Sequence, residues 1–266
     1  MAFSSYLSLL KEFVPPIVFR SSKYFERFLA AQLYKKGITN KTASHCFPYD
    51  RIPYSINAKY ILDIGANTGE TAFAALKTYP EAKLFCVEPV KSTFAILKRK
   101  LRPYRKRIKF YNCALSYKNG KSYINITSAP GANSLEKQAA CHKENNPTVR
   151  ELKKEKVKTF TLDFFSQKYF PNKKIDIVKI DVEGHEPVVL ENGIKFIQKY
   201  VDTILIEISL QRDESEKKQN LFKILQILNL AGFCIVNVFD LFHQENNPKK
   251  KLVQFDCVFR NTRFIE

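Results

Sequence analysis

The sequence predicts an α/β fold, in which a mostly parallel, doubly wound sheet is closed by an antiparallel strand pair. From residue 60 onward, apolar runs of strand length alternate with longer segments of helical periodicity, which is the pattern of a parallel sheet with crossover helices. The first of these runs, YILDIG, ends in an acid and a glycine where the next helical segment begins. The last two runs, FCIVNVF and LVQFDCVFR, are expected to pair antiparallel and to close the sheet.

The individual elements follow the chain in order. The expected strands are residues 60–65, 83–89, 108–116, 175–181 and 202–209 and the two closing runs. The expected helices are residues 70–79, 90–101 and 186–200 and a long amphipathic segment within residues 214–232. Pro80 and Pro103 stop the first two helices, and Pro187 suits the first turn of the third. Gly232 is the expected stop of the last helix.

Two regions depart from this alternation. In YKNGKSYINITS, Asn119 and Gly120 stand between two extended runs, which predicts a β-hairpin with a two-residue turn. Residues 128–156 are polar and poorly periodic, so a long insertion with a short helix around residues 134–141 is expected. KVKTFTLDFF then predicts extended structure followed by a helix.

The domain organisation follows from the same rhythm, which residues 1–58 lack. They contain two helical segments and a Pro-containing connector, and are interpreted as an accessory helical region beside a domain of residues 59–266. No run approaches the roughly 18 apolar residues of a membrane span. The N-terminal stretch does not have the pattern of a secretory signal, and suits a helix that docks on a surface.

The composition narrows the compartment and the partners. The formal net charge is +18, which favours anionic partners such as nucleic acid, anionic lipid headgroups, acidic glycans or sugar nucleotides, or reflects a plain solubility bias. The six cysteines include no C-x-x-C pair, so they are expected to be reduced and mostly buried. The expected location is cytoplasmic, with peripheral contact to the inner membrane surface as an option.

The turn after the first strand is the first candidate binding site. Its sequence, G-A-N-T-G-E, lacks the middle glycine of the dinucleotide fingerprint G-x-G-x-x-G and places Glu70 where a pyrophosphate would lie. Asp63 adds a second negative charge, so the turn suits a ligand with a cationic amino-acid part. The alternative is a tight turn that serves only helix–strand packing.

A carboxylate at the end of the second strand completes this candidate site. Glu88 can accept hydrogen bonds from both hydroxyls of a ribose. An adenosine-bearing ligand with a positive tail is S-adenosylmethionine, which is therefore the expected cofactor. The candidate cofactor-binding residues are Asp63, Gly65, Ala66, Asn67, Thr68, Gly69, Glu88, Pro89, Asn112, Cys113, Ala114 and Asp181, of which 112–114 would flank the adenine.

The second candidate site is in IDIVKIDVEGHEPVVL. Lys179 and Asp181 interrupt an apolar strand two residues apart, so they share one face of the sheet, and burying them is costly unless they pair or serve a site. The candidate catalytic residues are Lys179, Asp181, Glu183 and His185. Lys179 or His185 could polarise or deprotonate an acceptor hydroxyl, and Asp181 or His185 would assist loss of its proton. The alternative is a structural Lys179–Asp181 pair.

A metal ion is an option that the sequence does not favour. Asp181 and Glu207 end adjacent strands, and paired carboxylates suit Mg²⁺. No dense cluster of ligand residues accompanies them, so no metal ligand is predicted.

These segments together resemble a known family. LDIGANTGETA, CVEP, NCALS, TFTLDFF and IDIVKIDVEGHEPVVL are similar, in order and spacing, to the FkbM-type methyltransferases. The resemblance implies a Rossmann-like class I methyltransferase fold, S-adenosylmethionine as methyl donor, and O-methylation, often of a sugar hydroxyl in glycans, glycolipids or natural products. It covers about residues 61–209, and residues 1–58 and the polar insertion have no equally specific match.

Two alternatives stay open beside a saccharide or glycolipid acceptor. An RNA ribose 2′-O-methyltransferase would account for the basic segment KRKLRPYRKRIKF, although no RNA-binding module is visible and nucleic acid is not the favoured partner. A non-catalytic scaffold at an anionic membrane surface would use the same charge. The sequence does not predict an oligomeric state.

Overall fold

The computed structural model describes residues 48–128, 132–136, 149–210, 220–243 and 252–265. The predicted accessory region, residues 1–58, lies mostly outside this part of the chain, so its boundary stays a prediction. The expected short helix around residues 134–141 also falls largely outside the described residues.

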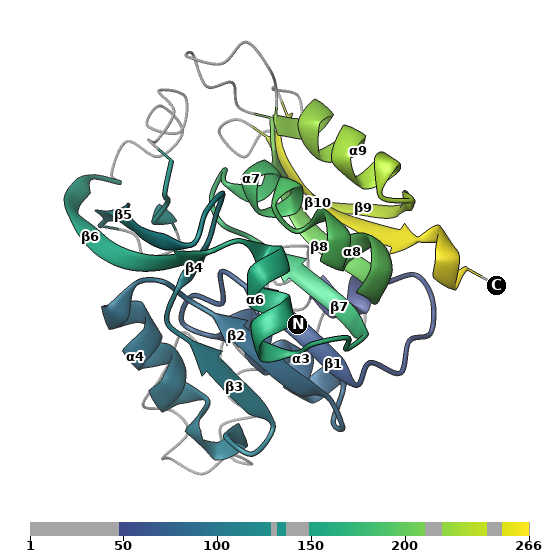
Figure 1. Ribbon diagram of the computed structural model, residues 1–266, viewed down its shortest axis with the longest axis horizontal. Helices are drawn as coiled ribbons and strands as arrows, with labels where there is room; N and C mark the ends of the chain where they lie inside the picture. Colours follow the sequence, from purple (N-terminus) through teal and green to yellow (C-terminus); the bar gives the residue numbers. More distant parts are fainter. Residues whose placement is uncertain (1–47, 129–131, 137–148, 211–219, 244–251, 266) are drawn as a thin grey trace, which may run out of the picture. The chain divides into compact units, whose positions relative to one another are not determined.

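The described residues contain a seven-stranded sheet with one reversed strand (Figure 1). Its strand order is β3-β2-β1-β7-β8-β10-β9. The bounds are β1 Tyr60–Ile64, β2 Lys83–Val87, β3 Ile108–Tyr111, β7 Ile175–Ile180, β8 Val201–Ser209, β9 Phe233–His243 and β10 Leu252–Asn261. β10 is antiparallel to both of its neighbours, β8 and β9, while the pairs from β3 to β8 are parallel. The predicted closing pair is confirmed, with β10 inside and β9 at the edge.

Helices connect the strands as expected, with one correction. They are α3 Glu70–Thr78, α4 Lys91–Lys100, α6 Leu162–Tyr169, α7 Glu186–Glu191, α8 Ile194–Tyr200 and α9 Asn220–Leu230, and short 3₁₀ turns cover Pro48–Arg51, Arg102–Tyr104 and Thr262–Phe264. Figure 1 shows α6 to α9 over one face of the sheet. The single helix expected over residues 186–200 is wrong, because the chain breaks at Asn192 and Gly193. There the Asn192 carbonyl accepts the Asp163 backbone N–H, and the Asp163 carboxylate accepts the N–H of Phe196 in the first turn of α8.

A second, three-stranded sheet replaces the predicted hairpin. Its order is β4-β6-β5, from β4 Ala114–Leu115, β5 Gly120–Thr127 and β6 Glu151–Phe160. The predicted pairing across Asn119 and Gly120 is wrong, because β6 lies between β4 and β5. The Asn119 side chain instead accepts the backbone N–H of Thr161, just after β6. The strand expected over residues 108–116 is split at Asn112 and Cys113, where the chain passes from one sheet to the other.

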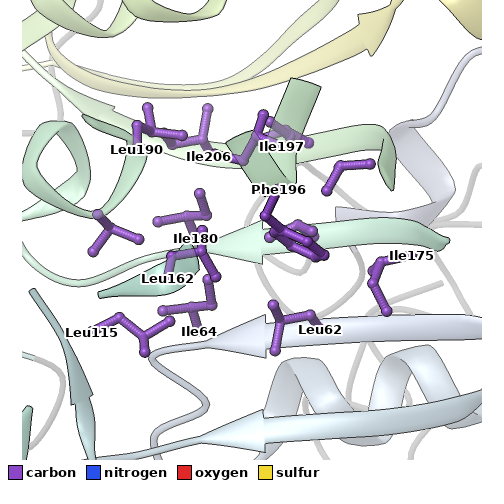
Figure 2. Close-up of a cluster of buried hydrophobic side chains, with 14 of the residues drawn as sticks. Leu62, Ile64, Leu115, Leu162, Ile175, Ile180, Leu190, Phe196, Ile197 and Ile206 are labelled. Carbon is purple, nitrogen blue, oxygen red and sulfur yellow. The ribbon is translucent and has the colours of Figure 1, made fainter. Parts of the chain in front are cut away.

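The core fills the space between the parallel strands and the helices above them (Figure 2). Leu62 and Ile64 of β1 and Ile180 of β7 are buried beside Leu162 of α6 and Leu190 of α7. Each such side chain stabilises the fold by about 1.5–3 kcal/mol relative to its exposed state. This packing brings the carboxyl ends of β1, β2 and β7 to one edge of the sheet.

Other expectations concern thiols and membranes. Cys86, Cys113, Cys234 and Cys257 are free thiols, and all but Cys234 are buried, as predicted. The two remaining cysteines lie outside the described residues. In the part of the chain that the structure describes, no helix is both long enough and apolar enough to span a membrane.

Candidate active site

A cavity of about 150 Å³ lies at the carboxyl edge of β1, β2 and β7. Its lining joins the two candidate motifs, which are far apart in the sequence. The lining residues are Ile64, Gly65, Asn67, Val87, Glu88, Pro89, Cys113, Ala114, Leu115, Ile124, Asn133, Ser134, Leu135, Asp181, Val182, Glu183 and His185. Most of the predicted cofactor-binding residues and most of the predicted catalytic residues therefore lie together at this edge.

Gly65 is required by close approach of two loops. Its φ is +82°, and a Cβ at this position would lie 1.8 Å from the backbone oxygen of Asp181. The Asp181 N–H in turn donates to the carbonyl of Ile64 at 3.1 Å. Only a residue without a side chain lets the turn after β1 contact the loop after β7 in this way.

Glu88 holds the glycine turn in place. Its Oε2 accepts the backbone N–H of Asn67 at 3.1 Å, and its Oε1 accepts that of Val90 at 2.9 Å. Burial raises the pKa of Glu88 to about 7, although these backbone donors favour the ionised form. The Oδ1 atom of Asn67 is buried with no hydrogen-bond partner among the described residues, which leaves an acceptor available to a ligand.

Several predicted cofactor residues lie behind the cavity rather than in its lining. Asp63 is fully buried, and its Oδ2 accepts the Thr71 hydroxyl at 3.0 Å. A Cβ on Gly69 would lie 2.7 Å from a side-chain carbon of Leu97, so this glycine allows α4 to pack closely. Asn112 donates through Nδ2 to the carbonyl oxygens of Glu88 and Pro89 and so fixes the loop after β2.

The other two residues of the turn, Ala66 and Thr68, also contact the protein rather than line the cavity. Ala66 is buried, with its N–H bonded to the carbonyl of Val87. The Thr68 hydroxyl donates to the Glu70 carboxylate, which also pairs with Lys100 at 2.6 Å. Their expected roles toward a cofactor stay predictions.

Lys179 forms a buried ion-pair group with two aspartates. Its Nζ lies 2.9 Å from Asp181 Oδ2, 3.7 Å from Asp63 Oδ1 and 3.4 Å from the carbonyl oxygen of Gly65. Burial by itself would lower the pKa of Lys179, but the two carboxylates outweigh it and hold the pKa above its ordinary value. Lys179 is therefore a permanent ammonium, which can orient or polarise but cannot take a proton.

Asp181 stands between this ammonium and the cavity. Lys179 holds its Oδ2, and no described residue donates to its Oδ1. Glu183, two residues later, also lines the cavity, and burial followed by the charge of Asp181 raises its pKa well above the ordinary value. A carboxylate that is held by one oxygen and open at the other can accept a proton from a hydroxyl group.

His185 is held at both ring nitrogens. Nδ1 lies 2.6 Å from Glu136 Oε1, and Nε2 lies 3.0 Å from Ser116 Oγ. The Ser134 hydroxyl donates to the carbonyl of Glu183 at 2.7 Å. Sequence reasoning missed Ser134 and Glu136, because nothing in the polar insertion signals that it reaches back to the loop after β7. It also missed Ser116, which ends an expected strand and reaches His185 only through the fold.

The carboxyl edge also carries a row of acids, of which the sequence analysis named Asp181 and Glu207 but missed Asp256. Asp256 of β10 lies directly opposite Glu207 of β8. The pairing of β7 with β8 ends one residue before Asp181 and Glu207, so these two acids follow it side by side. Burial, then the charges of Asp181 and Asp240, raises the pKa of Asp256 to about 8. An acid inside the apolar run LVQFDCVFR was the available signal.

Asp256 is expected to make stability depend on pH. Its folded pKa is raised from 3.8 to about 8, so its contribution is complete below pH 3.8 and is lost as pH rises toward 8. Asp256→Asn mimics the protonated form, and should raise the free energy of unfolding over wild type by about 3–4 kcal/mol more at pH 8 than at pH 5. Urea denaturation at both pH values measures this. Glu191→Gln, an exposed carboxylate on α7, is the control, and equal differences for both variants would contradict the assignment.

No group of three or more potential ligands among the described residues is spaced to hold a metal ion. Mg²⁺ stays an option that the sequence does not favour.

Comparison with known proteins decides the family. A model of the methyltransferase FkbM domain matches residues 63–235. The chain belongs to the FkbM methyltransferase family. The matched range includes the glycine turn, Glu88 and the loop after β7. The predicted resemblance and the class I methyltransferase fold are thereby confirmed, and the chain is a methyltransferase.

Individual relatives of this FkbM domain are distant. Methyltransferase sdnD of Sordaria araneosa is 27% identical over 210 residues, which are 71% of this chain and 78% of the relative. The 2-O-methyltransferase NoeI of Sinorhizobium fredii is 29% identical over 146 residues, which are 52% of this chain and 59% of NoeI. The crystal structure of an FkbM methyltransferase from Methylobacillus flagellatus superposes with a TM-score of 0.49 at 14% identity, over 79% of this chain and 45% of that one.

Proposed function

We propose that this FkbM domain is an S-adenosylmethionine-dependent O-methyltransferase, which methylates a sugar hydroxyl of a glycan, glycolipid or natural product. When bound, S-adenosylmethionine supplies an electrophilic methyl group on a sulfonium centre. The observation that carries the proposal is the cavity itself, in which Glu88 and the unpaired Oδ1 of Asn67 meet Asp181 across the Gly65 turn.

The residues present fit this cofactor. The Glu88 carboxylate would accept the ribose hydroxyls, and Asn67 Oδ1 would accept one further donor from the ligand. The loop after β7 adds the Asp181 carboxylate, whose charge suits a cationic amino-acid part. A dinucleotide fits less well, because the Glu70 carboxylate stands at the start of α3 where its pyrophosphate would bind.

The acceptor hydroxyl would meet Asp181. In this proposal Lys179 fixes the carboxylate through Oδ2, and the open Oδ1 accepts the proton as the acceptor oxygen attacks. His185, held by Glu136 and Ser116, would position the loop rather than take the proton itself. Much of the rate would come from holding the two reactants close together.

A hydroxyl acceptor is supported by the name of one relative. NoeI is a 2-O-methyltransferase and is 29% identical to this chain over the aligned residues. A saccharide is the acceptor class proposed here, and incubation with labelled S-adenosylmethionine and a panel of saccharides tests it. Label incorporated into RNA instead would favour a ribose 2′-O-methyltransferase.

The cofactor assignment predicts a pH-dependent affinity. Glu88 must be ionised to accept both ribose hydroxyls, and its pKa is about 7 in the free protein. The affinity for S-adenosylhomocysteine should therefore rise about 10-fold between pH 6 and pH 8, as the ionised fraction increases. Isothermal titration calorimetry measures this, with NAD as a control ligand.

Glu88→Gln provides the matched control for this experiment. The variant keeps the shape but cannot ionise, so binding should be at least about 10-fold weaker at pH 8 and should lose its pH dependence. A wild-type profile in the variant would refute the role of Glu88. If wild type binds no S-adenosylhomocysteine at all, a non-catalytic scaffold becomes the better explanation.

A further inference from the structure

A second hollow, of about 710 Å³, lies among β3, β6, α6 and the start of α4, which are labelled in Figure 1. It shares Pro89 and Cys113 with the cofactor cavity and otherwise has its own lining. None of the candidate catalytic residues contributes to it. Asn112 and Cys113, which are predicted to flank the adenine, also line it, but the proposed methyl transfer assigns no role to the rest of its lining.

The rim of the hollow is strongly cationic. Five exposed lysines and no acidic residue line it, namely Lys91, Lys121, Lys156, Lys158 and Lys168. Within the described part of the chain, none of these five ammonium groups forms an ion pair with a carboxylate. The nearby Glu155 carboxylate accepts the backbone N–H of Lys91 and not its ammonium group. The described residues around the hollow therefore leave this positive charge uncompensated.

Two of these lysines oppose each other directly. Lys121 of β5 and Lys158 of β6 are cross-strand partners in the antiparallel ladder. Like charges at directly opposite positions destabilise a sheet, so folding gives no reason for this pair. A bound anion between the two ammonium groups would remove the repulsion.

The floor of the hollow is aromatic. Phe110, Tyr111, Phe160 and Tyr169 line it, and the rings of Tyr111 and Tyr169 lie 4.6 Å apart between centroids. Lys168 Nζ lies 5.4 Å from the ring centroids of both Phe160 and Tyr169, which is cation–π distance. Such a floor suits a planar or apolar group that is attached to the anion.

We propose that this hollow binds a ligand carrying a diphosphate group. Lys168 contacts the aromatic rings, and the other four lysines supply more positive charge than a single phosphate group needs. The aromatic floor would contact the organic group attached to the diphosphate. A nucleoside diphosphate and a prenyl diphosphate share this chemistry. The hollow adjoins the cofactor cavity at Pro89 and Cys113, but none of its lysines lines that cavity, and the proposal does not depend on the identity of the methyl acceptor.

The test is isothermal titration calorimetry of the full chain with inorganic pyrophosphate at low salt. The Lys121→Gln/Lys158→Gln variant should bind at least 10-fold more weakly than wild type. Lys153→Gln/Lys154→Gln is the matched control, because both lysines are exposed on β6 outside the hollow and the net charge changes equally. The control should bind like wild type. Thermal unfolding without ligand should show that removing the opposed pair leaves the fold intact or more stable.

Further titrations identify the source of the diphosphate. Tighter binding of uridine diphosphate than of pyrophosphate supports a nucleotide, tighter binding of geranyl diphosphate supports a lipid, and equal binding of all three supports recognition of the diphosphate alone. Absence of saturable binding, or an equal loss in both double variants, would overturn the proposal. A competition experiment gives one more outcome that would overturn the proposal. If pyrophosphate displaces S-adenosylhomocysteine from the Lys121→Gln/Lys158→Gln variant as strongly as from wild type, the anion binds in the cofactor cavity instead.

Discussion

Asp181→Asn is expected to lower kcat for methyl transfer by about 100- to 1000-fold, because it removes the group that accepts the proton of the acceptor hydroxyl. The asparagine keeps the shape of the side chain and its contact with Lys179 on one side. Affinity for S-adenosylhomocysteine should change much less than kcat. Single-turnover methyl transfer and calorimetry on the same preparation separate the two effects.

Two comparisons make this prediction specific. Glu191→Gln removes an exposed carboxylate that pairs with Lys223 on the protein surface, and it should leave kcat unchanged. Thermal unfolding of Asp181→Asn checks that the buried Lys179, which still faces Asp63, does not unfold the site. Wild-type turnover by a well-folded Asp181→Asn variant would remove Asp181 from the proposed chemistry.

Gly65→Ala is expected to destabilise the protein by about 3 kcal/mol or more and to abolish cofactor binding. Two effects combine, because the left-handed backbone conformation strains an alanine and its Cβ would lie 1.8 Å from the Asp181 carbonyl oxygen. The turn after β1 and the loop after β7 would have to separate, and the cavity lies between them. Urea denaturation followed by circular dichroism measures the loss.

Gly184→Ala is the matched control for this prediction. Gly184 also has a positive φ, of +94°, but a Cβ there would meet no atom within 4 Å. It therefore reports the conformational strain alone, which is of the order of 1–2 kcal/mol. If Gly65→Ala loses no more stability than Gly184→Ala, the close approach to Asp181 is not what requires the glycine.

The sequence by itself determined the parallel sheet, the glycine turn and the position of Glu88. These features are local, because an apolar run, a turn and an acid at a strand end can each be recognised from a few consecutive residues. The helix stop at Gly232 is of the same kind, and its φ of +82° is the left-handed conformation that the prediction requires. Local patterns were weaker where a long-range partner competed, as β6 did by entering between β4 and β5.

Only the tertiary structure decided which of these residues meet. Three sets of contacts join segments that are far apart in the chain. Gly65 contacts Asp181, Glu136 and Ser116 hydrogen-bond to His185, and Asp256 lies opposite Glu207. Such pairs depend on strand order and register, which the whole core sets by burying the apolar faces of many elements at once. A single sequence carries the residue types for this site, whereas their distances and ionisation follow from how the sheets and helices pack.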